Sequence, residues 1–348
     1  MGNPPIKVVR NSSIELLRLY AMFFISYGHL MVFSPITEIK PLWFDFIQNC
    51  FGIGSVNLFI LITGYFLINK TDYTLQRFFK ILFETVFYFF LIALVFYTVG
   101  IGSVKDILLS FYPFAPSKFS VWFVVQYFGL ILIQPFLSQF AVRLSKRQYK
   151  GFLLILLLLS TTLTPVFPWG YLYSSSWKMW WFIVLFFTGG YLRLHFNSTK
   201  TAKYLLTTLI LSVIWSLCSI SELGKIISLE YNSILTYTIA ISLFIGIKNL
   251  HIKNSKTINL MASGTFAVYL IHQNYFVLNR LENFIIQCTS LNYSILINFI
   301  LTLGIIIAVF LFSIACDIVR QYLFKNLNIS QFEKLMSDKL LLFSNKVI

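Results

Sequence analysis

Residues 13–29 read SIELLRLYAMFFISYGH, and this apolar stretch indicates both the class of the protein and the place of its chemistry. It carries Glu15, Arg18 and His29 among side chains that suit a lipid bilayer. Ionisable groups are costly inside a membrane helix and are functional candidates by default. The eleven steps from Arg18 to His29 turn a helix by about 1100°, within roughly 20° of three full turns. The two side chains therefore share one helix face, roughly 16 Å apart along the axis.

The composition of the chain is that of a membrane protein. Of its 348 residues, 58% are hydrophobic and 11% are charged, and the mean hydropathy is +0.79. A soluble domain is nearer to about half apolar and a quarter charged. We therefore expect one all-α, polytopic membrane domain over residues 1–348, with about ten transmembrane helices. The expected spans are roughly residues 13–33, 45–69, 79–100, 119–140, 150–168, 177–195, 203–221, 231–248, 259–279 and 292–319.

The net charge of +15 is spread unevenly along the chain. Twenty Lys and Arg side chains fall in the N-terminal tail, in every second loop and in the C-terminal tail, whereas six fall in the alternate loops. This positive-inside pattern predicts that both termini face the cytoplasm and that the protein spans the plasma membrane several times. Because topology accounts for the basicity, we do not expect nucleic acid as a partner.

The sequence contains no pattern typical of a metal or cofactor site. The four cysteines form no CxxC pair, and metal-ligand spacing is absent. The chain also lacks a P-loop, a dinucleotide fingerprint, a G-x-S-x-G elbow and an H-E-x-x-H motif. We therefore expect no metal and no bound cofactor.

Residues 326–343 place apolar side chains at helical spacing and charged side chains elsewhere on the turn. This pattern predicts an amphipathic helix that lies on the inner membrane surface. A disordered tail is the alternative interpretation.

The ionisable residues of the first span each allow a structural and a chemical interpretation. His29 is either a neutral histidine bonded to a neighbouring helix or a general acid or base, since its ordinary pKa lies near neutral pH. Arg18 offers a planar fork suited to phosphate or carboxylate. Glu15 can pair with Arg18 three residues away, or it can form a capping box with Ser12.

The second span contains two glycines, Gly52 and Gly54, ahead of Ser55 and Asn57. One interpretation is close helix packing through small residues. The other is a break at Gly52–Gly54 with a new helix starting at Ser55, which would point free backbone N–H groups into a cavity.

Arg77 and Lys80 open the third span on the side where Arg18 lies. They are either ordinary positive-inside anchors or a basic cluster for a phosphorylated cytosolic ligand. Glu84 lies four residues after Lys80 on the same face and can neutralise it.

Three later residues are candidates for supporting roles. Trp122 opens the fourth span, where aromatic residues usually anchor a helix at the interface. Tyr269 and His272 lie in the ninth span. His272 is the second histidine well inside a span, and it is either a packing residue or a partner of the reactive groups.

Taken in order along the chain, these segments resemble acyltransferase family 3 of membrane proteins. The first-span pattern of Arg18 and His29, with an acidic residue three positions before the arginine, is similar to that of the family. The second-span motif has Asn57 where the family usually has Asp, and Thr63 where it has Ser, so an acidic role at position 57 is not supported. The other similar segments are Arg77–Lys80, Trp122-Phe123, Gln134-Pro135, Phe187–Gly190 and Tyr269–His272.

The resemblance implies transfer of an acyl group, most often acetyl from acetyl-CoA, to a hydroxyl of an extracytoplasmic polysaccharide or glycolipid. The partners would then be acyl-CoA, a cell-surface glycan and the bilayer. On this interpretation Arg18, Arg77 and Lys80 bind the phosphates of the donor. Glu15 orients Arg18.

The same interpretation gives His29 the chemical step. It deprotonates the acceptor hydroxyl or, as a second route, takes the acyl group itself. Asn57, or the N–H groups near Ser55, stabilises the developing oxyanion.

Two other functions fit a chain of this type. A transporter or lipid-linked glycan flippase also needs charges in the membrane and a broken helix. A glycan polymerase usually carries a large outer loop with several arginines, whereas the outer loops expected here are short and sparse in Lys and Arg.

Overall fold

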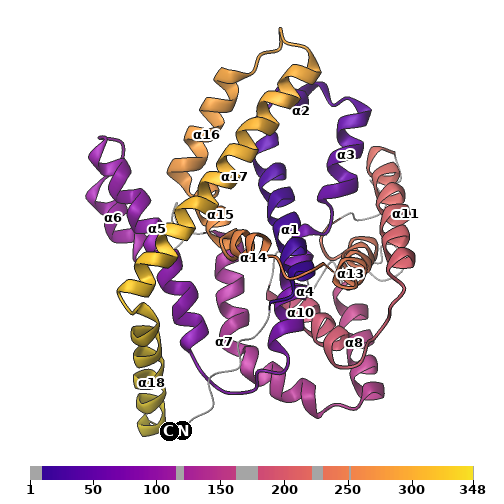
Figure 1. The fold of residues 1–348 in the computed structure, drawn as a ribbon, viewed down its shortest axis with the longest axis vertical. Helices are drawn as coiled ribbons and strands as arrows, with labels where there is room; N and C mark the ends of the chain where they lie inside the picture. The colour runs from indigo at the N-terminus through magenta and orange to yellow at the C-terminus, as the bar shows by residue number, and fades with distance from the viewer. Residues whose placement is uncertain (1–9, 115–120, 162–178, 222–229, 251, 348) are drawn as a thin grey trace.

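The computed structural model describes residues 10–114, 121–161, 179–221, 230–250 and 252–347. Over these residues the chain is helical, with no β-strand (Figure 1). The all-α prediction is therefore confirmed for the part of the chain that the structure describes. The helices are α1 (Ser12–Met31), α2 (Ile36–Ile39), α3 (Leu42–Gly52), α4 (Ser55–Leu67), α5 (Gln76–Thr98), α6 (Val104–Ser110), α7 (Trp122–Arg143), α8 (Lys146–Ser160), α10 (Met179–Leu194), α11 (Thr201–Ile220), α13 (Ile234–Lys248), α14 (Lys256–Ser263), α15 (Thr265–His272), α16 (Tyr275–Cys288), α17 (Ile295–Asn326) and α18 (Ile329–Val347).

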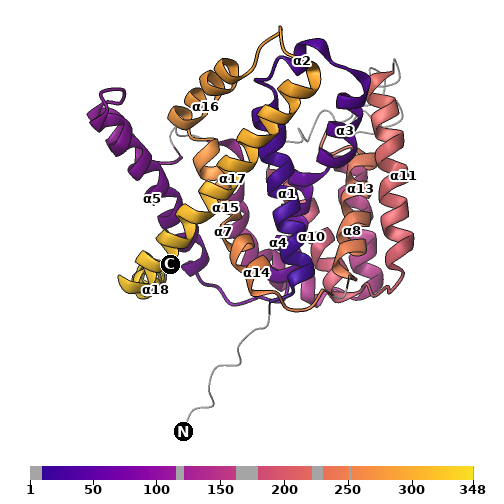
Figure 2. The same ribbon diagram turned by 45° about the horizontal axis from the view of Figure 1, so that its top comes forward.

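Helix α1 lies in the centre of the bundle and contacts α3, α4, α13, α14, α15 and α17 (Figures 1 and 2). Its start is fixed by Asn11, whose side chain accepts hydrogen bonds from the backbone N–H groups of Ser13 and Ile14. Such caps satisfy N–H groups that have no partner inside the helix. The helix that carries Arg18 and His29 is thus held on several sides, and its two ionisable groups have fixed neighbours.

Helices α4 and α10 pack with their backbones in close approach. A Cβ atom added at Gly64 would fall far inside van der Waals contact with the carbonyl oxygen of Phe186, and one added at Gly189 would meet the carbonyl oxygen of Leu61 in the same way. Small residues allow helices in membranes to approach this closely. The glycines therefore fix the position of α4 against α10.

Of the two interpretations of the second span, the structure shows the break at Gly52–Gly54. Helix α3 ends at Gly52 and α4 begins at Ser55, and Gly54 between them has φ +75°. This left-handed conformation is accessible to glycine at little cost. The break turns the start of α4, with Ser55 in its first turn, toward the interior next to α1.

Five helical segments are long and apolar enough to cross a membrane. Their length and composition support the expectation of a membrane protein. The five segments are Leu42–Leu67, Gln76–Thr98, Trp122–Arg143, Thr201–Ile220 and Ile295–Asn326. The shorter apolar helices Met179–Leu194 and Ile234–Lys248 lie within two further expected spans. The ten spans and the orientation of the termini stay predictions.

The expected span 259–279 is not one continuous helix. It is divided into α14, α15 and α16 by breaks at Gly264 and at Gln273-Asn274. Asn274 caps α16 by accepting a hydrogen bond from Phe276 N. The eight residues of α15 rise only about 12 Å, less than half of the roughly 30 Å hydrocarbon core. Residues 162–168 of the expected span 150–168 lie outside the described residues.

The C-terminal segment forms a helix, α18, which packs beside α5 (Figure 1). Ser337 Oγ accepts a hydrogen bond from Leu75 N at 3.0 Å. Glu333 and Ser337 are buried, whereas Phe332 and Leu335 are about half exposed at 49% and 48%. Two polar side chains of α18 thus face the protein, and part of its apolar surface is exposed together with Lys334, Asp338 and Lys339. The place of α18 on a membrane surface stays a prediction.

Candidate active site

A pair of histidines joins α1 to α15. His29 lies in the last turn of α1 and His272 ends α15. His29 Nδ1 lies 3.0 Å from His272 Nε2, and the two ring centroids are 5.3 Å apart. His272 is fully buried, so the contact is made in the interior. The structure therefore brings together two histidines that the sequence analysis had identified separately and that are 243 positions apart in the chain.

The contacts of His272 fix the proton positions in the neutral pair. His272 Nδ1 lies 2.6 Å from the Val268 carbonyl oxygen, and a carbonyl only accepts, so this nitrogen carries the hydrogen. In a neutral imidazole the other nitrogen, Nε2, is then the acceptor. His29 Nδ1 must donate to it. His29 Nε2 is consequently left with its lone pair, which is the form that a general base requires.

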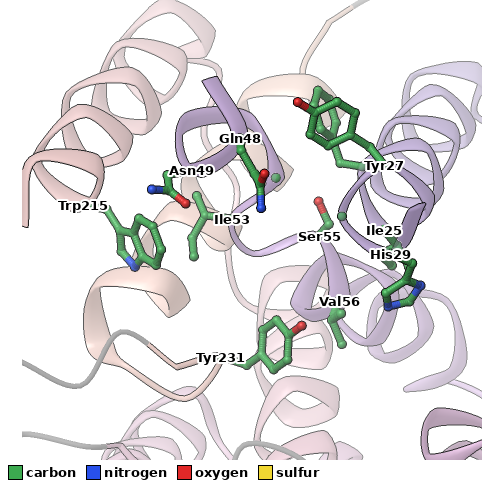
Figure 3. A pocket seen from close by; sticks show the side chains of 13 residues that line it. Ile25, Tyr27, His29, Gln48, Asn49, Ile53, Ser55, Val56, Trp215 and Tyr231 are labelled. Carbon is green, nitrogen blue, oxygen red and sulfur yellow. The ribbon is translucent and has the colours of Figure 1, made fainter. Parts of the chain in front are cut away.

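An open cavity of about 260 Å³ lies at His29 and is named here the amide cavity. It is lined by Gln48 and Asn49 from α3, Ser55 from α4, Tyr231 and Trp215. Figure 3 shows the side chains of Gln48 and Ser55 facing one another across it, with His29 at its edge.

Ser55 is a buried polar group of this cavity with unused hydrogen-bonding capacity. Its side chain is 2% exposed, and its Oγ has no hydrogen-bond partner among the described residues. It stands at the first turn of α4, where backbone N–H groups are not bonded inside the helix. The start of α4 is therefore equipped to bind an oxygen that carries negative charge.

A second, much smaller cavity of about 10 Å³ lies on the other side of His29 and is named the constriction. It shares Ile25, His29, Val56 and Tyr231 with the amide cavity. Its other walls include the predicted supporting residues Trp122 and Tyr269 together with Phe59 and Phe123. A volume of this size holds about one water molecule.

The third cavity, of about 400 Å³, contains the predicted basic cluster and is named the arginine cavity. Arg18, Arg77, Lys80 and Glu84 line it, and it shares Phe59 and Phe123 with the constriction. Arg18 Nη1 bonds Glu15 Oε2 at 2.8 Å. Arg77 Nη1 donates to Gln134 Oε1 at 3.1 Å. The structure thus brings all three predicted donor-binding cations to one cavity.

The fourth cavity, of about 580 Å³, is named the basic cavity. It shares Arg18, Lys80, Glu84 and Ser263 with the arginine cavity. Its lining holds five Lys or Arg side chains against two Glu side chains, and the cations are Arg10, Arg18, Lys80, Arg320 and Lys325.

Sequence reasoning missed a buried ionic group beside the basic cavity. Arg320 Nε donates to Asp317 Oδ1 at 2.6 Å, and Arg320 Nη2 lies 3.4 Å from Glu84 Oε1. Tyr88 Oη donates to the same Asp317 oxygen at 2.8 Å. The expectation that Glu84 neutralises Lys80 is therefore incomplete, because Glu84 also forms an ion pair with Arg320. The sequence did contain a signal for this ionic group. Asp317 and Arg320 lie three residues apart at the end of the last long apolar stretch, a spacing that allows an ion pair on a helix.

Asn57 has a scaffolding position. Its Nδ2 donates to the Tyr231 carbonyl oxygen at 2.7 Å, and its Oδ1 accepts from Trp181 Nε1 at 3.0 Å. It is fully buried and lines none of the four cavities described above. These contacts hold α4 to α10 and engage both polar atoms of the Asn57 side chain.

The described residues contain no group of three or more His, Cys, Asp or Glu side chains that could hold a metal ion.

A family model described as an acyltransferase domain matches residues 11–318. The match covers α1 to most of α17. It includes the lining of all four cavities except for the part of the basic cavity formed by Arg10, by the end of α17 from Arg320 onward and by α18. No curated protein and no solved structure matches the chain.

Proposed function

Since the chain belongs to acyltransferase family 3, we propose that it moves an acyl group, most readily acetyl, from cytosolic acyl-CoA to a hydroxyl of an extracytoplasmic polysaccharide or glycolipid. The observation that carries the proposal is the row of four cavities, each sharing residues with the next, with His29 at the narrow point. A membrane acyltransferase with donor and acceptor on opposite sides needs such an arrangement.

The donor half of the row is the basic cavity and the arginine cavity. The phosphates of CoA bind most strongly where cations outnumber carboxylates and are partly shielded from water. Arg18, Arg77 and Lys80 in the arginine cavity fit this role. Arg10 and Lys325 add two cations in the adjoining basic cavity. Glu15 holds the Arg18 fork in place through the 2.8 Å ion pair.

The distance between the two groups suits the neutral arm of the donor. Arg18 and His29 lie roughly 16 Å apart on one face of α1. With its phosphates at Arg18, the donor extends its pantetheine arm along α1 and brings the thioester to His29. The charged part then stays out of the apolar interior, where it would be costly.

The acceptor half is the amide cavity. Amide and aromatic side chains such as Gln48, Asn49 and Trp215 suit the hydroxyls and the ring faces of a sugar. In the proposed step, His29 Nε2 takes the proton of the acceptor hydroxyl as its oxygen bonds to the thioester carbonyl carbon. The Ser55 hydroxyl and the free N–H groups at the start of α4 stabilise the oxyanion.

The second half of the step restores the starting state. The tetrahedral intermediate collapses, the C–S bond breaks, and the CoA thiolate receives the proton held by His29. His272 keeps the His29 ring oriented and stabilises the imidazolium as it forms. Direct acylation of His29 is a second route for the same groups.

This proposal includes the topology. The basic cavity faces the cytoplasm, both termini are cytoplasmic, and ten spans lie in the plasma membrane. Reporter fusions after Lys150 and at the C-terminus should read cytoplasmic, and a fusion after Ser175 should read external. An external C-terminus would overturn the span count and the orientation together.

The experiment that tests the activity uses purified protein in liposomes with labelled acetyl-CoA and a cell-envelope glycan fraction. We expect alkali-labile label in the glycan, and NMR of that fraction should show O-acyl signals. A transporter or flippase, which the family match does not favour, would move a solute and bind no acyl-CoA. Absence of acyl transfer together with absence of acyl-CoA binding would refute the proposal.

A further inference from the structure

Two aromatic rings separate the histidine pair from the basic half of the protein. Phe59 from α4 and Phe123 from α7 line both the constriction and the arginine cavity. Their ring centroids are 6.4 Å apart and the rings are nearly perpendicular, at 81°. The cavity behind them has room for about one water molecule. An acyl group therefore reaches His29 only after one of these rings turns aside.

The two rings are held very differently. Phe123 is buried and contacts Tyr127, Phe182 and Tyr269 at centroid distances of 5.7, 5.4 and 5.3 Å. A ring packed on three sides has little freedom to change rotamer. Phe123 is thus a fixed wall.

Phe59 is the movable partner of the pair. Among the residues that the structure describes, its one ring contact is with Phe123. It is half-buried, and one side of its ring borders the 400 Å³ arginine cavity. That space allows the ring to swing without displacing the backbone. The backbone at this point is fixed, since α4 is packed closely against α10 at Gly64.

We propose that Phe59, closing against Phe123, is the residue that selects the size of the acyl group. This inference rests on the proposed acyl transfer and goes beyond it by naming the selecting residue. Once the ring has turned aside for the donor arm, it lies beside the thioester and takes up the space that further methylenes of the acyl chain would need. In hydrophobic pockets, one methylene changes discrimination by roughly 10–200-fold. Butyryl has two methylenes more than acetyl. This difference is large enough for kcat/KM with butyryl-CoA to fall far below kcat/KM with acetyl-CoA.

The test compares acetyl-CoA, propionyl-CoA and butyryl-CoA as donors for the wild-type protein and for Phe59→Ala. We expect the ratio of kcat/KM for butyryl to that for acetyl to rise at least about 10-fold in Phe59→Ala, because the ring that occupies the space is gone. Phe59→Leu, which keeps an apolar side chain of intermediate size, should give a smaller rise in the same direction. The matched control is Phe66→Ala on the same helix, since Phe66 is 38% exposed and lines none of the four cavities. Its ratio should equal that of the wild type.

The outcomes separate this inference from the proposed function. Wild-type transfer from acetyl-CoA with an unchanged ratio in both Phe59 variants would overturn the selecting role and leave acyl transfer standing. A wild-type protein that transfers no acyl group from any of the three donors would overturn both. If Phe59→Ala does not fold, the ratio measured for Phe59→Leu decides the question by itself.

Discussion

Replacing His272 by alanine should slow acyl transfer markedly without removing either substrate site. His272 lies at the second nitrogen of His29, at 3.0 Å, and touches neither the amide cavity nor the basic cavity. In the variant, His29 Nδ1–H has no acceptor, and the ring is free to adopt the other tautomer. His29 Nε2 then carries the hydrogen part of the time and cannot take the acceptor proton.

The expected size of the effect follows from one lost hydrogen bond in a buried site. An unsatisfied buried donor costs about 1–3 kcal/mol. At about 1.4 kcal/mol for each factor of ten in rate, kcat should fall roughly 5–150-fold. His272→Gln should recover most of this loss, because the glutamine carbonyl oxygen reaches the place of Nε2 and accepts the same hydrogen bond.

Labelled-acetyl transfer in liposomes measures kcat, and calorimetry with acetyl-CoA confirms that donor affinity is unchanged. Protein that elutes as one species in detergent, with a wild-type melting temperature, excludes misfolding as the cause. A wild-type rate in His272→Ala would refute the tautomer argument. Equal losses in the alanine and glutamine variants would reduce His272 to a packing residue.

Three further outcomes follow from the described geometry. His29→Ala should lower transfer about 10²–10⁴-fold at unchanged membrane expression; near-normal transfer would make His29 structural. Arg18→Lys should raise the KM for acetyl-CoA more than the KM for the glycan, since a point charge replaces a planar fork. Calorimetry on Arg18→Ala provides the check. An unchanged CoA affinity in that variant would leave Arg18 as a structural partner of Glu15 only. Gly64→Ala should destabilise the protein by at least about 1–3 kcal/mol, because its Cβ would collide with the Phe186 carbonyl oxygen; a lowered melting temperature checks this, and an unchanged one would contradict the close packing of α4 and α10.

Local features of the sequence predicted local structure well. The break before Ser55 needed only two glycines and a helix start, and both are properties of a few neighbouring residues. The shared face of Arg18 and His29 needed only the helical repeat. Hydropathy predicted where apolar helices lie, but not that Gly264 would break the ninth span, because an isolated glycine has no fixed meaning inside a helix.

Contacts between distant parts of the chain could not be predicted in the same way. His272 was recognised as a histidine inside a span, yet its bond to His29 depends on how α15 packs against α1. Arg320 was counted with the charges of the inner tail, whereas the fold buries it with Asp317 and brings it to Glu84. Pairing of this kind is decided by tertiary packing, which a single sequence does not display.

The narrow apolar passage at Phe59 also has an electrical consequence. Where polar cavities enter a membrane protein from both sides, the insulating layer is thinnest at the point that separates them, and the membrane potential drops mostly there. Each elementary charge carried across it exchanges about 2.3 kcal/mol with a potential of 100 mV. In the proposed reaction only the neutral thioester end enters this layer, so the acyl group crosses without drawing on the potential. If the proposed function and topology hold, the ring that restricts the passage also limits the leakage of protons across the membrane.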